Sequence, residues 1–337
     1  MRVLYIGSES GTSLYRARAL QRLGHDVRLF DLRKAVILNN RVLGAWAFRT
    51  GGLFLEKTST LKLLDAVGDD KFDLVWVDGG ELVGPTLVRE LRARFGCVVN
   101  YNHDDPFGDR DGWRSRLYLA AVREYSLLVV VRDCNIAEAR SLGARKVLRV
   151  FRSADEVAHA PRDLRASDLE KWSNQFVFVG TWMPERGPFM LDLIRRNVPI
   201  AIYGNSWNRA REWPAIKQSW RGPARDAPDE YALTIQCAKI CLGLLSKGNR
   251  DFHTTRSMEI PYLGSLFLAE RTPEHQFLYR EDQEAVFWSN SAECAEKCLT
   301  LLGDDERCSA IAAAGRARCI ANGHLNEKVI ASILASI

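Results

Sequence analysis

The 337-residue sequence has no apolar stretch close to the roughly 20 residues that a membrane-spanning helix needs. Its first residues, MRVLYIG, lack the basic region, apolar stretch and cleavage site of a signal peptide, and they predict a first strand instead. The eight cysteines include no C-x-x-C pair, which argues against a zinc site or redox motif and favours packing cysteines in a reducing compartment. We therefore expect a cytoplasmic protein.

Two further absences narrow the classes of ligand. The 47 basic residues are scattered among 42 acidic ones and form no Lys/Arg-rich tract, so we do not expect a nucleic-acid partner. The net charge of +5 suits an anionic small ligand or a loose approach to an anionic membrane surface. The first strand is followed by G-x-x-x-G (Gly7 and Gly11) rather than G-x-G-x-x-G, which argues against an NAD-dependent oxidoreductase.

What the sequence does contain is a regular alternation of strands and helices. Hydrophobic residues make up 47% and charged residues 26%, as in globular proteins, and the length suits two domains of about 150 residues. Near-continuous Val, Leu and Ile runs predict a parallel sheet covered by helices on both faces. In the first half, strands are expected at 2–7, 26–32, 72–78, 97–102, 126–131 and 146–151, and helices at 13–24 and 85–95.

The alternation stops and then starts again. The polar stretch 153–172 contains no convincing strand and is predicted to link an N-terminal domain (1–152) to a second domain (173–322). In that second domain, strands are expected at 175–180, 200–204, 239–246 and 265–270, and a helix near 186–196. The last segment, 323–337, is a helix that could pack back on the N-terminal domain. The predicted fold is α/β, with two facing Rossmann-like doubly wound domains and a ligand cleft at their strand ends.

The segment after the strand at 239–246 has the residue types of a nucleotide site. Lys247 is the first charge after this apolar run, and Thr254 or Thr255 could cap the short helix that follows. The amides of Thr254, Thr255 and Arg256 would be free to bind an anion, and the Arg256 fork suits a phosphate. Glu259, one turn further, could reach sugar hydroxyls. A nucleotide needs cations and amides to bind its phosphates and a carboxylate to bind the diol of its ribose, and this segment offers both.

Two other turns follow strands of the same domain. Arg186 stands at the start of the helix after 175–180, where it could face a phosphate or lie on the surface. Gly204 and Asn205 form a turn that could let a flat base approach the backbone, or could be an ordinary turn.

The order of these segments carries a resemblance. FVGTWMPERGPFML, IAIYGNSW, CAKICLGLLSK, TTRSMEIPYLGSLFLAE and EAVFW resemble the C-terminal half of group 1 glycosyltransferases, closest to their spore-maturation-protein-like branch, over about 176–290. The resemblance implies the GT-B architecture and transfer of a sugar from a nucleotide-sugar. It also implies a retaining reaction without a metal ion or other cofactor.

The resemblance also implies roles for individual residues. The family's Glu-x7-Glu signature maps its second Glu onto Glu259, which would contact the ribose, and its first onto Asp251. The side chain of Asp251 is one methylene shorter than the Glu of the family signature. Arg186 and Lys247 would correspond to the basic pair on the diphosphate. Pro261 fits only if the helix begins near residue 258, because an interior proline costs about 3 kcal/mol.

In the N-terminal domain the resemblance is weaker. It suggests that Gly11 and Thr12 approach the donor phosphates or sugar, and that His103, in NYNHDDPFGDRDGW, contacts the donor sugar. That stretch could instead cap a helix or brace a loop. Another interpretation treats the four acidic residues of this stretch as metal ligands: Asp104, Asp105, Asp109 and Asp111. A metal-dependent fold of that kind would leave the second Rossmann-like half unexplained.

The aromatic and apolar segment 42–58 predicts a helix and loop that cover the sheet. The alternative is an acceptor-side or membrane-facing lip.

The sequence thus predicts a hexosyl or other glycosyltransferase that moves a sugar from a nucleotide-sugar, with a UDP-sugar slightly favoured, to a carbohydrate, glycolipid or protein acceptor. His103 and Asp251 would orient the sugar, while Arg186, Lys247 and Arg256 would stabilise the leaving diphosphate. The alternatives are a nucleotide-sugar epimerase and a non-catalytic nucleotide- or sugar-binding protein on the same frame.

Overall fold

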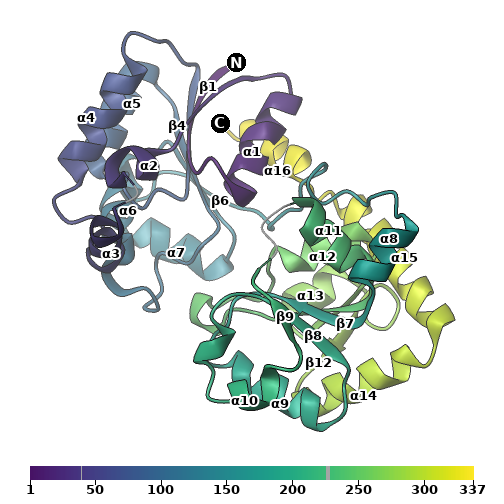
Figure 1. The fold of residues 1–337 in the computed structure, drawn as a ribbon. Coiled ribbons are helices and arrows are strands. Elements are labelled where there is room, and N and C mark those ends of the chain that lie inside the picture. Colours follow the sequence, from purple (N-terminus) through teal and green to yellow (C-terminus); the bar gives the residue numbers. More distant parts are fainter. Residues whose placement is uncertain (39, 225–227) are drawn as a thin grey trace. The chain divides into compact units, whose positions relative to one another are not determined.

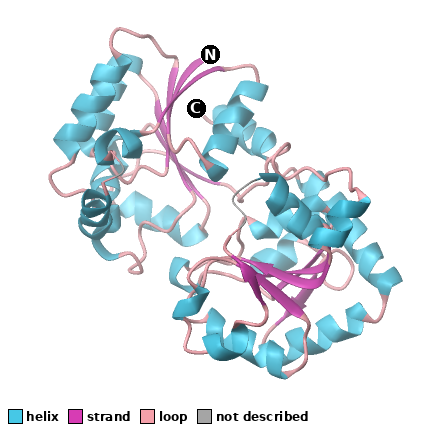
Figure 2. Ribbon diagram, viewed as in Figure 1, coloured by secondary structure: helices cyan, strands magenta, loops and turns pink. Residues whose placement is uncertain are grey.

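The computed structural model describes residues 1–38, 40–224 and 228–337. The chain forms two compact units. Unit 1 comprises residues 1–151, 248–250 and 326–337, and unit 2 comprises residues 152–247 and 251–325. Each unit is built around one sheet of six strands with helices packed on it (Figures 1 and 2).

The sheet of unit 1 is parallel throughout, in the order β2-β1-β3-β4-β5-β6. Successive residues of β1 enter opposite cores, with Leu4 and Ile6 in one and Val3 and Tyr5 in the other. Both faces are therefore buried, which is why these strands read as continuous apolar runs. The strands are β1 (Arg2–Ile6), β2 (Asp26–Phe30), β3 (Leu74–Asp78), β4 (Val98–Asn102), β5 (Leu127–Val130) and β6 (Val147–Arg149).

The helices of unit 1 divide between those two faces. Helix α1 (Gly11–Arg22) packs with α16 (Asn326–Leu334) on the Val3 and Tyr5 face, so the end of the chain belongs to unit 1. The opposite core receives side chains from α2 (Leu32–Ile37), α4 (Glu56–Val67), α5 (Pro85–Phe95), α6 (Arg116–Ala121) and α7 (Asp133–Ser141). Helix α3 (Arg41–Thr50) adds Ala47 to it, and the 3-10 turn η2 (Val122–Glu124) adds Val122. Another 3-10 turn, η1 (Gly112–Ser115), precedes α6.

The sheet of unit 2 has the order β12-β11-β10-β7-β8-β9 and is also parallel. Its strands are β7 (Asn174–Val179), β8 (Ile200–Tyr203), β9 (Trp220–Gly222), β10 (Ala238–Gly243), β11 (Leu266–Glu270) and β12 (Val286–Trp288). Its helices are α8 (Ala166–Trp172), α9 (Arg186–Arg195), α10 (Trp213–Ile216), α11 (Pro228–Gln236), α12 (Arg256–Leu263), α13 (Pro273–Leu278), α14 (Ser291–Leu302) and α15 (Asp305–Asn322). Short 3-10 turns occur at η3 (Trp207–Arg209) and η4 (Lys247–Asn249).

Each sheet contains one point where the strand order reverses. In unit 1 the chain moves from β1 to β2 on one side and from β3 to β6 on the other, so the reversal lies between β1 and β3. In unit 2 it lies between β7 and β10. Open α/β sheets bind ligands outside the carboxyl ends of the strands that flank such a point.

The predicted fold class is confirmed, with two doubly wound parallel sheets. The strand expected over 26–32 is shorter, because Asp31 caps α2 by accepting the Lys34 amide. Strand β9 has three residues and gives no sequence signal of its own. Helix α8 lies within the stretch expected as a linker, which the structure groups with unit 2.

Among the described residues, no helix has the length and apolar character needed to cross a membrane. All eight cysteines are free thiols.

Candidate functional site

The strand reversal of unit 2 is bridged by Arg186. This residue opens α9, and its guanidinium reaches back to donate to the Thr181 carbonyl after β7 (2.7 Å) and to the Leu245 carbonyl after β10 (3.3 Å). It therefore lies at the carboxyl ends of the two strands where a ligand is expected.

Arg186 is a buried cation that has no counterion among the described residues. It is 8% exposed, no carboxylate of the described residues forms an ion pair with it, and its Nε is buried without a hydrogen-bond partner in the same described set. Burial lowers the pKa of Arg186 to about 10 despite the opposing charge of the neighbouring Glu185. Because isolated buried charges are costly, such a guanidinium indicates an anionic ligand.

A cavity of about 260 Å³ brings Arg186 together with Lys247. Lys247 comes from the segment after β10 and is ion-paired with Glu270 at the end of β11, and its side chain is 58% exposed. Phe189 and Trp288 form an aromatic wall, with ring centroids 4.7 Å apart. The two cations predicted to bind the diphosphate therefore line one pocket, and Lys247 is the more accessible of them.

Glu259 lies inside the protein, at 1% exposure. Its Oε2 accepts hydrogen bonds from the Tyr231 hydroxyl (2.7 Å) and from Arg256, which also lies over the Tyr231 ring. Burial alone would raise the pKa of Glu259, but the charge of Arg256 and the hydrogen bonds from Tyr231 and Arg256 hold it below its usual value. The carboxylate is therefore ionised and balanced by Arg256, so it does not oppose an anion near Arg186.

His159 completes the surroundings of Glu259. Its Nδ1 accepts the Asp155 amide (2.8 Å), so the neutral ring carries its proton on Nε2, 3.4 Å from Glu259 Oε1. Burial lowers the pKa of His159, with the charge of Glu259 opposing this. The sequence patterns do not single out His159, because it lies in a polar stretch 100 residues from its partner. The proposed contact of Glu259 with ribose stays a prediction.

Helix α12 begins at Arg256 with Thr255 at its N-cap position, which is one of the two cap residues expected, although no side chain caps the helix. Pro261 therefore lies in the helix interior, and the condition that the helix begin near residue 258 is not met. The proline cannot donate to the Ser257 carbonyl four residues back, and the Tyr279 hydroxyl donates to that carbonyl instead (2.7 Å). This replacement bond explains why the helix tolerates the proline.

The expectation of three free amides at this helix start also needs correction. The Thr254 amide donates to Ser257 Oγ (3.1 Å). No acceptor among the described residues faces the amides of Thr255 and Arg256, so these two keep the predicted anion-binding geometry.

Asp251 is buried and accepts a hydrogen bond from Arg152 (3.2 Å), a residue at the start of unit 2. Its charge acts on Arg186, whose pKa it raises. Asp251 is therefore close enough to influence the bridging guanidinium, and its action on a sugar stays a prediction.

Gly204 and Asn205 line neither the cavity that contains Arg186 and Lys247 nor the pocket at the strand reversal of unit 1. A Cβ on Gly204 would lie 1.8 Å from the Gly180 carbonyl, so this glycine lets the ends of β7 and β8 approach closely. The Asn205 side chain accepts the Ala224 amide (3.2 Å). Both residues have structural partners, and the structure gives no further support for base binding.

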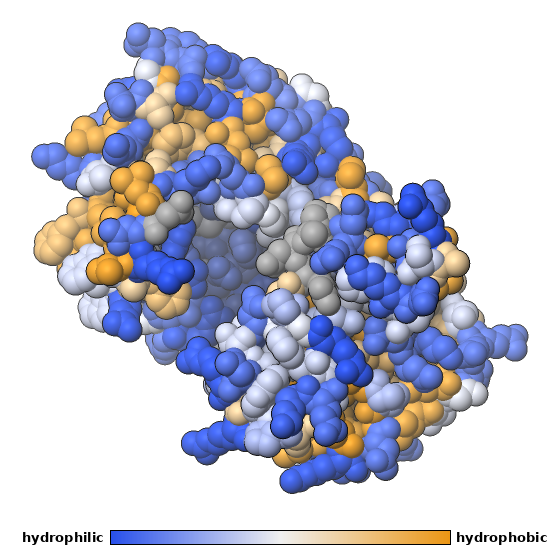
Figure 3. Space-filling model, viewed as in Figure 1, coloured by the Kyte–Doolittle hydropathy of each residue, from blue (hydrophilic) through white to orange (hydrophobic). Residues whose placement is uncertain are grey.

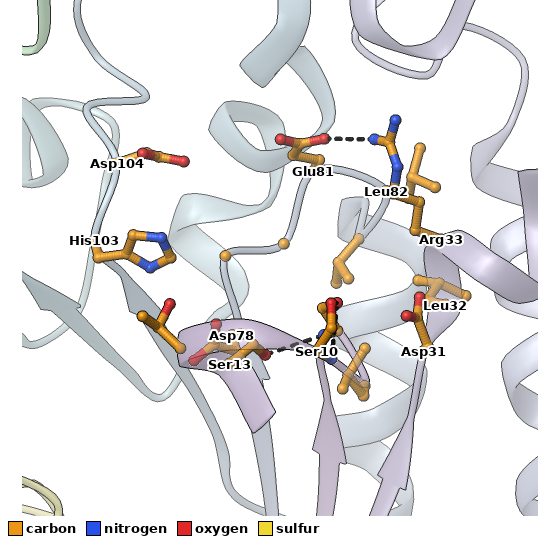
Figure 4. A pocket seen from close by; sticks show the side chains of 18 of the residues that line it. Ser10, Ser13, Asp31, Leu32, Arg33, Asp78, Glu81, Leu82, His103 and Asp104 are labelled. Carbon is orange, nitrogen blue, oxygen red and sulfur yellow. Dashed lines mark hydrogen bonds and ion pairs between the residues drawn. The ribbon is translucent and has the colours of Figure 1, made fainter. Parts of the chain in front are cut away.

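Unit 1 has its own pocket at the reversal between β1 and β3 (Figure 4). This pocket, of about 570 Å³, is lined by three predicted site residues: Gly11, Thr12 and His103. Gly11 adopts φ 58° at the start of α1 and a Cβ there would meet nothing within 4 Å, so it leaves open space where the backbone turns into the helix. In Figure 4, His103 and Asp104 lie across the pocket from Asp31.

A buried ion pair at the floor of this pocket is absent from the sequence predictions. Asp78, the last residue of β3, accepts two hydrogen bonds from Arg16 (2.6 and 2.8 Å) and one from the Tyr5 hydroxyl (2.7 Å). Arg16 Nη2 lies 3.4 Å from His103 Nδ1. Burial would raise the pKa of Asp78, but the charge of Arg16 and these bonds keep it below its ordinary value. The available signal was a charge directly after an apolar strand, which also marks Lys247.

The acidic stretch after β4 does not form a common site. Asp105 is held by Arg250, also in unit 1, and by Asn135, whereas Asp111 is held by Arg110 and Arg114. Within the described parts of the chain, no three His, Cys, Asp or Glu side chains gather to hold a metal ion.

Comparisons with known proteins agree with the geometry of unit 2. Residues 186–335 match the family model described as "Glycosyl transferase-like", beginning at the bridging arginine. No curated protein matches the sequence.

Solved structures share the whole fold. Sucrose-phosphate synthase from Thermosynechococcus elongatus has a TM-score of 0.69 at 12% identity, over 100% of this chain and 98% of that chain. HepE from Anabaena in complex with UDP-glucose has a TM-score of 0.66 at 14% identity, over 100% of both chains. A Listeria monocytogenes structure named as a putative UDP-N-acetylglucosamine 2-epimerase has a TM-score of 0.61 at 12% identity, over 99% of this chain and 95% of that chain. The chain therefore has the GT-B architecture.

Proposed function

We propose that the protein is a glycosyltransferase that moves a sugar from a nucleotide diphosphate sugar to an acceptor. The observation that carries the proposal is Arg186, a buried guanidinium at the strand reversal of unit 2 that no carboxylate in the described part of the chain pairs with. A diphosphate would supply the missing negative charge. The glycosyl transferase-like match over 186–335 and the shared fold support this reading.

The chemistry asked of these residues is electrostatic. When the bond from the sugar to the diphosphate breaks, negative charge develops on the leaving phosphate, and preorganised donors lower the barrier most effectively. In this proposal Arg186, Lys247 and the amides of Thr255 and Arg256 would stabilise that charge. It is supported by the shared pocket of Arg186 and Lys247 and by the position of the two amides at the start of α12. We further propose a retaining reaction without a metal ion.

The donor base is proposed to be uracil. HepE has been solved with UDP and with UDP-glucose, and those ligands are facts about HepE. For this chain the acceptor class stays open between carbohydrate, glycolipid and protein.

A nucleotide-sugar epimerase is the second candidate, favoured by the fold shared with the structure named for UDP-N-acetylglucosamine 2-epimerase. Incubation with a nucleotide-sugar alone separates the two, because an epimerase changes the sugar without an acceptor. Tight nucleotide binding with no turnover on any acceptor would favour a non-catalytic binding protein.

A thermal-shift screen with UDP, GDP, dTDP and ADP tests the proposal first. A ligand that binds only the folded state raises stability by RT ln(1 + [L]/Kd), so the correct nucleotide should stand out from the other three. If no nucleotide raises the melting temperature, the proposed donor site is wrong. A chelator should leave both binding and turnover unchanged.

Glu259→Gln should weaken donor binding if the carboxylate also holds the ribose. The substitution removes the charge that Arg256 balances, so isothermal titration with the nucleotide should be accompanied by a melting curve. Tyr231→Phe is the matched control, because it removes one hydrogen bond to the same carboxylate and keeps its charge. Unchanged nucleotide affinity in a folded Glu259→Gln variant would remove the ribose assignment.

A further inference from the structure

Unit 1 carries an exposed apolar surface that the proposed donor site does not use. Figure 3 shows hydrophobic side chains gathered at the edge of unit 1 where Figure 1 draws α3. We call it the α3 surface. Six large hydrophobic side chains with exposed fractions from 45% to 82% form it: Leu38, Val42, Trp46, Phe48, Phe54 and Trp113.

Helix α3 does not cover the sheet in the way the sequence suggested. Its sequence, RVLGAWAFRT, is mostly apolar, yet Ala47 is its one buried residue. Helices of globular proteins usually turn their apolar stripe toward the core. Here Val42 and Trp46 face solvent instead, which marks an interaction site when such side chains are contiguous.

The backbone holds these side chains outward. Leu38 and Phe54 both have positive φ values (51° and 66°), uncommon for residues other than glycine, and they are 71% and 82% exposed. At the end of α3, a Cβ on Gly51 would lie 1.9 Å from the Trp113 carbonyl, so a glycine is needed to bring Trp113 beside the helix. Such conformations persist where function uses them.

The segment that carries most of the α3 surface, residues 38–62, has a positive net charge. Residues 38–62 contain four basic residues and one acidic residue, Glu56, whose carboxylate accepts the Thr86 amide. Arg41, Arg49 and Lys57 are exposed, and none has a carboxylate partner within the described ranges. An apolar patch rimmed by such cations complements an anionic bilayer, where the apolar groups enter the acyl boundary and the arginines meet headgroups. Two copies pairing through the same patch would instead bring like charges together.

We propose that unit 1 docks peripherally on anionic lipid bilayers through the α3 surface. Phe48 also lines the pocket of unit 1, so docking places that pocket next to the headgroup layer. The proposal does not depend on the nucleotide-sugar site of unit 2.

Flotation of the full chain with phosphatidylcholine vesicles, with and without phosphatidylglycerol, tests the proposal. We expect binding to the anionic vesicles, weakened by added salt because the charges are exposed. V42S/F54S should lower the partition coefficient by about tenfold or more. R41Q/R49Q should lower it by about fivefold for each arginine. Phe277→Ser on α13 of unit 2, where the side chain is 76% exposed, is the matched control and should bind like the wild type.

Three outcomes would overturn the proposal. They are the absence of flotation with either vesicle, flotation that V42S/F54S leaves unchanged, and a concentration-dependent dimer that V42S/F54S abolishes without any vesicle binding. The last result would make the α3 surface an interface between copies. Nucleotide binding by V42S/F54S, measured in parallel, should equal that of the wild type and shows that the variant is folded.

Discussion

Arg186→Met should abolish the thermal shift produced by the nucleoside diphosphate and lower sugar transfer by about 100-fold or more. The same variant without ligand should unfold with a free energy within about 1 kcal/mol of the wild type. The two effects separate because the guanidinium is expected to serve the ligand rather than the fold.

The physical basis is the missing counterion. In the ligand-free protein, the desolvation of Arg186 is offset by bonds to the carbonyls of Thr181 and Leu245 but by no carboxylate of the described residues. Substitution by methionine removes these two hydrogen bonds, which lowers the free energy of unfolding, and it also removes the buried charge, which raises it. With a diphosphate bound, methionine forfeits a charge-assisted contact and nothing offsets the loss.

Arg195→Met is the matched control, since Arg195 lies in the last turn of the same helix and is exposed. It should leave melting temperature, thermal shift and transfer unchanged. A large fall in the stability of ligand-free Arg186→Met, with the nucleotide shift intact, would show that Arg186 is structural and would remove the main support for the proposed function.

Asp78→Asn should destabilise the protein by about 3–5 kcal/mol, because it leaves Arg16 buried without its counterion. Both side chains of the pair are at most 5% exposed, so little water can replace the lost charge. Equilibrium denaturation by urea measures the difference. Asp192→Asn, which removes the carboxylate of an exposed pair with Arg196, should change the curve little.

The destabilisation should depend on pH in one direction. The pKa of Asp78 in the folded state lies below its ordinary value of 3.8, because Arg16 outweighs the effect of burial. The stability that the ionised group contributes is thus fully present above that ordinary value and is lost as pH falls through the lower folded value. The difference between wild type and Asp78→Asn should be constant near neutral pH and should shrink below pH 3.8.

A double substitution completes the test of this pair. Arg16→Met with Asp78→Leu removes both charges together and should recover most of the stability that Asp78→Asn loses. If Asp78→Asn unfolds at the same urea concentration as the wild type, the buried pair does not hold the floor of the pocket.

Local sequence signals were sufficient to predict an element when the residues that start and end it lie within the same segment. Helix α5 runs from Pro85 to Phe95 as expected, because proline starts a helix readily and Gly96 ends it with φ 79°. The apolar strands were predictable for a related reason, since burial on both faces leaves no polar alternation to obscure them. The position of Arg186 and Lys247 after two such strands also followed, because parallel strands end at the same edge of a sheet.

Partners distant in the sequence could not be predicted in this way. From the sequence, Glu259 could be interpreted as a carboxylate available to a ligand. In the structure His159, 100 residues away, and Tyr231, 28 residues away, contact it. The apolar sequence of α3 predicts a helix that covers the sheet, but in the structure Ala47 is its one buried residue. That α12 tolerates Pro261 in its interior could not be foreseen, because the replacement bond from Tyr279 to the Ser257 carbonyl comes from the end of another helix.

The sequence by itself determined the two doubly wound sheets and the strand ends where charged residues gather, because hydrophobic periodicity and turn residues act within a few positions. The tertiary structure alone decided which of those charges are compensated: Asp78 and Glu259 each meet an arginine, whereas Arg186 meets none among the described carboxylates. Charge compensation depends on distance and burial in three dimensions, and neither quantity is contained in the spacing of residues along the chain.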